Sequence, residues 1–106
     1  MPRYVPRREI GRQWGQDLYI MCAGPDLVKV GRSYDAERRL GEVQRGAPWM
    51  DIHLAAVFAD RGAVETMAHA VLSDWGFRRM GGEWWACTVG QASAAIAEAL
   101  SQIEAE

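Results

Sequence analysis

Residues 17–33, DLYIMCAGPDLVKVGRS, decide the fold of the N-terminal half of this chain. Two short apolar runs, LYIMC and LVKVG, flank the tetrapeptide AGPD, whose Gly-Pro pair is a strong turn signal. The stretch therefore predicts a β-hairpin. Because side chains alternate along a strand, we expect Tyr19 on one face of the first strand, and Lys29 and Gly31 together on one face of the second.

Downstream of this hairpin, apolar residues recur with helical spacing in three segments. We expect helices over 36–47, 60–75 and 88–103, and a third strand over 51–58. Ser33 or Asp35 is the expected N-cap of the first helix, Asp60 of the second and Thr88 of the third, and Gly76 is expected to end the second. The apolar positions on these helices are Ala36, Leu40, Val43 and Ala47; Val64, Met67, Ala68, Val71, Leu72 and Trp75; and Ala92, Ala95, Ile96, Ala99, Leu100 and Ile103. The sequence thus predicts an α+β fold with a small three-stranded antiparallel sheet flanked by helices, in the order β-β-α-β-α plus a C-terminal helix.

Composition sets broad limits on the class of protein. The chain has 106 residues, 49% of them hydrophobic and 25% charged, which fits one domain. Cys22 and Cys87 stand far apart without metal-ligand spacing, so neither a disulfide framework nor a structural zinc site is indicated. No run approaches the roughly 18 consecutive apolar residues of a membrane span. We therefore expect a cytoplasmic protein with no membrane partner.

Charge is distributed unevenly along the chain. Residues 1–45 have a formal balance of +3 and residues 46–106 one of −5, which gives the net charge of −2. Proteins that bind duplex DNA through charge alone are usually far more basic. The composition therefore argues against a tight, unselective nucleic-acid binder and permits a small basic face. The segment 1–16, broken by Pro and Gly and carrying several Arg residues, predicts an N-terminal arm, and 17–106 a single domain.

Several polar residues fall where the pattern predicts apolar surroundings. Tyr19 and Lys29 lie inside apolar strands, and Arg39 lies at the border of a helical stripe. Glu65 and His69 are four residues apart, so they stack on one side of the second helix. Taken singly, packing, snorkelling from an edge or ordinary solvation explains each of them.

Their order along the chain carries more information than any one of them. The series LYI, VKVGRS, ERRL, E-x-x-x-H and GEWW, over about residues 17–86, resembles the GIY-YIG nuclease superfamily. It is most similar to a small phage and bacterial branch with a VKIGR-like second motif and a Gly-Glu-Trp-aromatic element. The resemblance implies a divalent-metal-dependent endonuclease of a bacterial or phage-infected cell, acting on DNA more readily than on RNA.

The resemblance also implies roles for individual residues. Catalytic roles fall on Tyr19 for proton transfer, Arg39 for the phosphate and Glu65 as the carboxylate for one Mg²⁺ or Mn²⁺ ion. Lys29 replaces the tyrosine of the second motif, and either a base or a phosphate-binding cation is consistent with its position. Supporting roles fall on His69 and Glu83, and phosphate contacts on Arg32 and Arg38.

Two other functions are compatible with the same residues. One is a catalytically silent module with this fold that binds nucleic acid or a protein partner. The other is a structural domain whose polar residues are incidental, which predicts that their side chains do not converge. For the nuclease, the net charge of −2 leaves little means of holding a DNA site, so we expect a homodimer, the Arg-rich arm or a targeting protein to assist.

Overall fold

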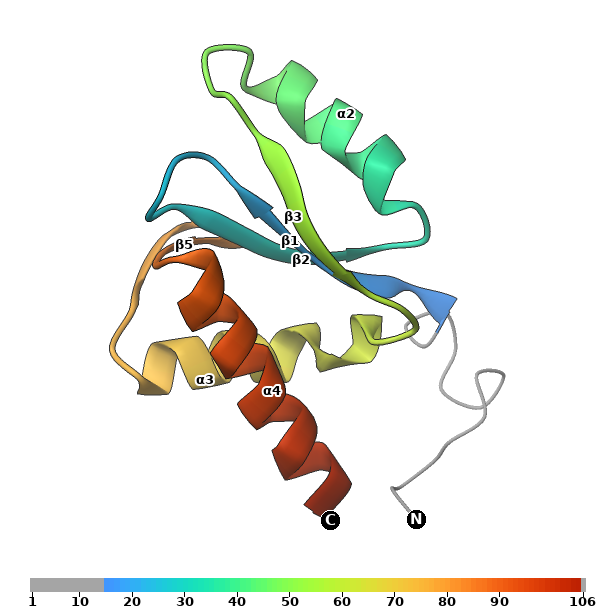
Figure 1. The fold of residues 1–106 in the computed structure, drawn as a ribbon, viewed down its shortest axis with the longest axis vertical. Coiled ribbons are helices and arrows are strands. Elements are labelled where there is room, and N and C mark those ends of the chain that lie inside the picture. The colour runs from blue at the N-terminus through green and yellow to red at the C-terminus, as the bar shows by residue number, and fades with distance from the viewer. Residues whose placement is uncertain (1–14, 106) are drawn as a thin grey trace.

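The computed structural model describes residues 15–105, which form an α+β fold in three layers. A five-stranded antiparallel sheet in the order β3-β1-β2-β5-β4 forms the middle layer. Helix α2 covers one face, and α3 and α4 cover the other (Figure 1). The elements are β1 (Asp17–Cys22), β2 (Val28–Ser33), α2 (Ala36–Gly46), β3 (His53–Phe58), the 3₁₀ turn η2 (Gly62–Val64), α3 (Glu65–Asp74), β4 (Arg78–Gly81), β5 (Trp84–Ala86) and α4 (Val89–Ala105).

The predicted hairpin forms the centre of the sheet. β1 and β2 pair with Tyr19 opposite Gly31 and Met21 opposite Lys29, so these four residues share one face. Tyr19 and Met21 are buried on the side of α2. The alternate residues Leu18, Ile20, Val28 and Val30 are buried on the side of α3 and α4. β1 is therefore apolar on both faces because both are covered.

The prediction of a three-stranded sheet is wrong, because the sheet has five strands. β4 and β5 form a second hairpin, and β5 pairs with β2. The turn uses two glycines with positive φ, Gly81 at 138° and Gly82 at 54°. All four residues of β4 are exposed, and β5 is only three residues long. Neither strand offers the apolar alternation from which a strand is predicted.

Local capping chemistry confirms several of the expected helix ends. The carboxylate of Asp35 accepts a hydrogen bond of 3.1 Å from the Arg38 amide and so caps α2. Thr88 and Gln91 exchange the two hydrogen bonds of a capping box, at 2.9 and 3.0 Å, before α4. Gly76, with φ of 87°, ends α3 with the two hydrogen bonds of a Schellman motif.

The start of α3 differs from the prediction. Asp60 does not cap this helix; it adopts φ of 58°, and its amide donates a 3.0 Å hydrogen bond to the Asp17 carboxylate. The loop is held against the start of β1, and the helix begins only at Glu65. Trp75 was expected on the buried face but is 47% exposed, because the helix ends at Asp74 and the chain turns away.

No helix within residues 15–105 is long and apolar enough to cross a membrane. The N-terminal arm expected over 1–16 lies outside the described residues except for its last two.

Candidate active site

The candidate site lies at the edge of β2, where its pairing with β5 ends. β5 pairs with Val28 and Lys29, and one further backbone hydrogen bond of 3.0 Å joins the Val30 amide to the Glu83 carbonyl. β2 continues to Ser33, so its last residues extend beyond β5. Glu83 is thus placed beside the edge of β2, between the two faces of the sheet.

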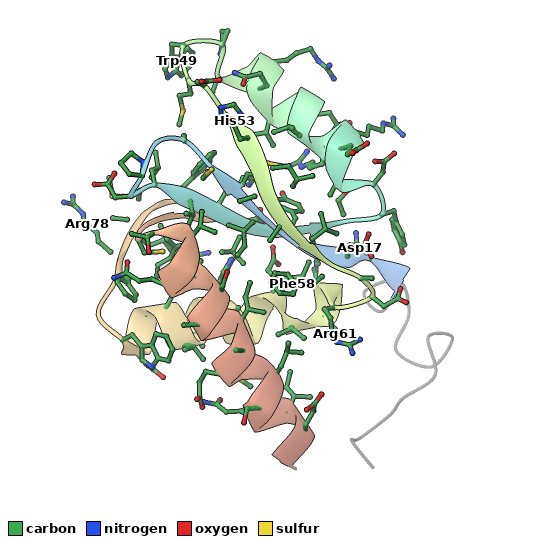
Figure 2. The ribbon with its side chains drawn as sticks, viewed as in Figure 1. Asp17, Trp49, His53, Phe58, Arg61 and Arg78 are labelled. Atoms are coloured by element: carbon green, nitrogen blue, oxygen red, sulfur yellow. The ribbon has the colours of Figure 1, made fainter. Side chains whose placement is uncertain are left out.

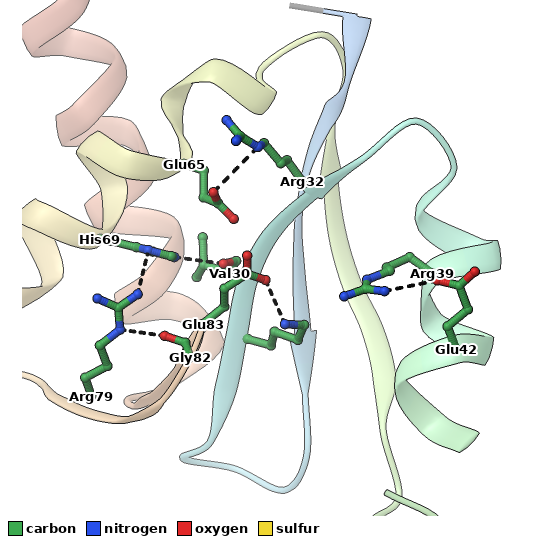
Figure 3. A network of polar contacts seen from close by, with 10 residues as sticks. Val30, Arg32, Arg39, Glu42, Glu65, His69, Arg79, Gly82 and Glu83 are labelled. Atoms are coloured by element: carbon green, nitrogen blue, oxygen red, sulfur yellow. Dashed lines mark hydrogen bonds and ion pairs between the residues drawn. The ribbon is translucent and has the colours of Figure 1, made fainter. Parts of the chain in front are cut away.

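Glu83 links side chains from both faces. On the α2 side it accepts a 2.7 Å hydrogen bond from the Lys29 ammonium, which is only 7% exposed (Figure 3). On the α3 side its carboxylate interacts with that of Glu65. The ion pair with Glu83 offsets the cost of burying the Lys29 side chain. Glu83 therefore contacts Lys29 and Glu65, one on each face of the sheet.

Gly31 leaves the space that these groups occupy. A Cβ at this position would lie 2.6 Å from Oε1 of Glu83 and would also overlap the hydroxyl of Tyr19. Both oxygen atoms therefore sit directly over the backbone of Gly31. A residue with any side chain there would push the phenol or the carboxylate away.

Tyr19 is a buried phenol beside the Arg39 guanidinium. Its side chain is fully covered, and Arg39 acts on its hydroxyl from close by without forming a hydrogen bond of good geometry. Burial raises the pKa of Tyr19 to about 12, and the Glu83 carboxylate adds to this rise, whereas Arg39 opposes it. Tyr19 is therefore a neutral phenol at physiological pH, with a cation nearby that stabilises its ionised form.

Arg39 extends from α2 toward the strands (Figure 3). Its Nη1 forms a 3.0 Å ion pair with Glu42 on the same helix. The contact with Glu42, and then that with Tyr19, raises the pKa of the guanidinium, so it stays charged. Arg39 does not contact Glu65. Arg39 acts on the Tyr19 phenol, and Glu83 acts on both that phenol and the Glu65 carboxylate, so the two residues are linked only indirectly.

Glu65 stands at the first turn of α3 and is 8% exposed. Its Oε1 lies 3.7 Å from Nε of Arg32, and its Oε2 is buried without a hydrogen-bond partner. Burial raises the pKa of Glu65 to about 7; Glu83 adds to the rise, and Arg32 and Lys29 oppose it. Burial also acts to raise the pKa of Glu83, but hydrogen bonding to Glu65 and Lys29 outweighs it and lowers that pKa.

His69 has a defined tautomer. Its Nε2 lies 2.8 Å from the Val30 carbonyl, which can only accept, so Nε2 carries the hydrogen. The other nitrogen, Nδ1, faces Nη2 of Arg79 at 3.4 Å. Burial lowers the pKa of His69, because the charged ring would lose hydration. Both ring nitrogens are thus engaged within the protein.

The arginines predicted to contact phosphate gather in a hollow of the surface. Arg32, Arg38 and Arg39 line a depression of about 330 Å³ beside the start of α2. Arg38 is the most exposed of them and forms a 3.7 Å ion pair with Glu42. Arg32 also reaches Glu65, so this hollow adjoins the buried carboxylates.

The structure thus brings most of the predicted site residues to one edge of the sheet. Tyr19 and Glu83 meet over Gly31, and Glu83 joins them to Lys29 on one face and to Glu65 on the other, whereas Arg38 stays at the rim and His69 lies further along α3. Sequence reasoning missed Arg79, which contacts His69 and Trp85. Its signal is its position opposite Trp85, which becomes visible only once the pairing of β4 with β5 is known.

Glu65 and Glu83 are the residues able to hold a divalent cation here. Within the described residues, no group of three or more His, Cys, Asp or Glu side chains is arranged to hold a metal ion. The buried Oε2 of Glu65 lacks a partner, which fits a cation held by one or two carboxylates with water completing its shell, as Mg²⁺ commonly is.

Comparison with known proteins identifies one family. The family model of the T5orf172 domain matches residues 18–100. No curated protein matches the chain, and no solved structure matches it. The matched range includes all of the candidate site residues.

Proposed function

The chain belongs to the T5orf172 domain family, a GIY-YIG-like domain of nuclease type, and we propose that it is a divalent-metal-dependent endonuclease that hydrolyses phosphodiester bonds in DNA. The observation that supports this most is the convergence on Glu83: the Tyr19 phenol meets it over Gly31, the Lys29 ammonium pairs with it, and Glu65 reaches it from the other face of the sheet, with an arginine beside the phenol. A structural domain with incidental polar residues would not be expected to gather them at one sheet edge.

In this proposal the arginines hold the phosphate. Hydrolysis adds negative charge to the non-bridging oxygen atoms in the transition state, so a fixed cation beside them lowers the barrier. Arg39 supplies that cation from α2. Arg32 and Arg38, which line the same hollow, contact the neighbouring backbone and position the strand.

In this proposal Tyr19 is protonated before the reaction and takes part in proton transfer at the reacting phosphate. A phenol with a pKa of about 12 is a hydrogen-bond donor at neutral pH. Its unpaired hydroxyl is free to bond to a phosphate oxygen or to the attacking water, and Arg39 stabilises the phenolate if the proton moves. Lys29 acts as a charged group that holds Glu83 in place, rather than as a free amine.

Glu65 is the residue that would hold the metal ion, with Glu83 beside it. A bound Mg²⁺ or Mn²⁺ would supply charge neutralisation at the leaving oxygen. With a pKa of about 7, Glu65 is partly protonated in the metal-free protein, so cation binding and proton release are coupled at this carboxylate.

A plasmid-nicking assay tests the proposal. Supercoiled DNA is incubated with Mg²⁺ or Mn²⁺ and wild-type protein, Arg39→Ala or Glu65→Ala, with Arg45→Ala as the control that removes an exposed arginine from the same helix. We expect wild type and Arg45→Ala to nick equally, and the two site variants to be at least 100-fold slower, the usual scale for a lost transition-state contact, about 10²–10³. Equal nicking by all four proteins would overturn the proposal, and so would no nicking by wild type.

We also propose that targeting requires a second copy of the chain, the Arg-rich arm or a separate protein. The net charge of −2 provides little non-specific affinity for DNA. Light scattering after gel filtration tests the first alternative: a mass near twice 11.8 kDa indicates a homodimer, whereas a mass near 11.8 kDa leaves the Arg-rich arm or a separate targeting protein.

A further inference from the structure

Arg79 is an arginine held in place from three directions. Its Nε donates to the Gly82 carbonyl at 2.5 Å, and its Nη2 faces Nδ1 of His69 at 3.4 Å. The guanidinium carbon lies 5.2 Å from the ring centre of Trp85, within range of a cation–π contact. Trp85 lies directly opposite Arg79 in the β4–β5 pair, so both side chains project from the same face of the sheet.

These contacts fix the guanidinium without neutralising it. Each partner is a neutral group: a backbone carbonyl, an indole ring and an imidazole whose Nε2 is bonded to Val30. Within residues 15–105 no ion pair to a carboxylate accompanies them. An exposed arginine usually moves freely, and ordering it costs entropy. A cation ordered in advance and left unpaired is suited to binding an anion.

Arg79 faces a cleft that also reaches the carboxylates of the candidate site. The cleft has a volume of about 530 Å³, within the range of ligand sites, and Glu65, Thr66, His69, Arg79, Glu83 and Trp85 are among the residues that line it. Glu65 lies in this cleft, and its ion-pair partner Arg32 lines the arginine hollow on the other side. The two depressions therefore adjoin at the Arg32–Glu65 contact.

We propose that Arg79 binds a backbone phosphate next to the scissile phosphate, on the same nucleic-acid strand. We also propose that His69 is a positioning residue for Arg79. This inference rests on the proposed function. One strand would run from the hollow of Arg32, Arg38 and Arg39, across Glu65, into the cleft of Arg79. His69 bonds to the β2 backbone through Nε2 and to the guanidinium through Nδ1, and so sets the distance between Arg79 and the site.

A binding assay with a matched control tests this assignment. Affinity for labelled single-stranded and duplex oligonucleotides is measured in EDTA, which prevents cleavage, over a series of salt concentrations. Arg79→Ala is compared with Arg78→Ala, which removes the same charge from the adjacent residue of β4, where the side chain projects into solvent (Figure 2). We expect Arg79→Ala to weaken binding about tenfold and to lower the salt slope by about one, as for one lost phosphate contact, and Arg78→Ala to change neither. Arg79→Lys should fall between them, because it keeps the charge and loses the fixed fork.

A double-mutant cycle tests the role of His69. If His69 acts through Arg79, then His69→Ala weakens binding, and adding it to Arg79→Ala has no further effect. A purely structural His69 would lower the thermal stability of both backgrounds equally and add its binding defect to that of Arg79→Ala.

The outcomes separate this inference from the proposed function. Equal salt slopes for Arg78→Ala and Arg79→Ala, alongside nicking that depends on Glu65, would overturn the role of Arg79 and leave the nuclease intact. Reduced binding by Arg79→Ala in a protein that nicks no DNA would support the phosphate contact and overturn the hydrolase. Failure of the wild-type protein to bind any oligonucleotide would overturn both, and binding of an acidic peptide instead would reassign the cleft to a protein partner.

Discussion

Replacing Glu65 by glutamine is expected to abolish cleavage and yet to stabilise the metal-free protein at pH 8. The folded protein holds the Glu65 proton up to about pH 7, whereas the unfolded chain releases it near the ordinary value of 4.5. Since the folded state binds more protons between these values, the Glu65 contribution to stability is fully present below pH 4.5 and is lost as pH rises toward 7. Glutamine has no charge to bury and does not suffer this loss.

The magnitude follows from the size of the pKa shift. A rise from 4.5 to about 7 corresponds to about 3.5 kcal/mol at most, at about 1.4 kcal/mol per pKa unit. The lowered pKa of Glu83 contributes stability that is lost only as pH falls below 4.5, outside this range, but its coupling to Glu65 makes the net difference measured for the pair smaller. We expect Glu65→Gln to gain about 1–3 kcal/mol over wild type at pH 8, or roughly 4–13 °C in Tm for a domain of this size.

Thermal unfolding followed by circular dichroism, in EDTA at several pH values from 5 to 8, measures this difference. Glu104→Gln, which changes an exposed carboxylate near the end of α4, is the control and should shift Tm by little at any pH. The stability gap between Glu65→Gln and wild type should be small at pH 5 and widen toward pH 8. A variant less stable than wild type at pH 8, with a wild-type Tm that does not change over this range, would refute the reasoning.

Three further substitutions test other parts of the site. Gly31→Ala should lower the free energy of unfolding by about 1–3 kcal/mol in urea titrations, because its Cβ would overlap Tyr19 and Glu83; an unchanged midpoint would contradict the packing described. Tyr19→Phe should leave Tm unchanged or higher, since it removes a buried hydroxyl without a partner, while slowing nicking by at least tenfold; full activity would exclude a role in proton transfer. Lys29→Met should reduce nicking by the same factor at pH 6 and pH 9 if the lysine acts as a fixed charge, whereas a loss confined to high pH would indicate a base.

The parts of the fold that could be predicted from sequence depend on local chemistry. The hairpin turn at AGPD, the Asp35 cap and the Thr88 capping box each involve groups within a few residues of one another. The start of α3 was missed because the Asp60 amide bonds to Asp17, a residue far away in sequence. The fourth strand was missed because its exposed residues carry no apolar pattern.

The same distinction applies to the candidate site. Motif order identified Tyr19, Lys29 and Glu65, and in the structure all three surround Glu83. The bridging position of Glu83 depends on where β5 stops pairing with β2, and that of Arg79 on its register opposite Trp85. Both follow from strand pairing, which a single sequence does not specify for strands this short and exposed.

A crystal structure of Tyr19→Phe with Mn²⁺ and a short DNA duplex tests the central claim most directly. The account predicts an anomalous manganese peak at the carboxylate of Glu65, with a backbone phosphate within hydrogen-bond distance of the Arg39 guanidinium. Manganese bound elsewhere, with Glu65 still facing Arg32 and the DNA distant from Arg39, would contradict it.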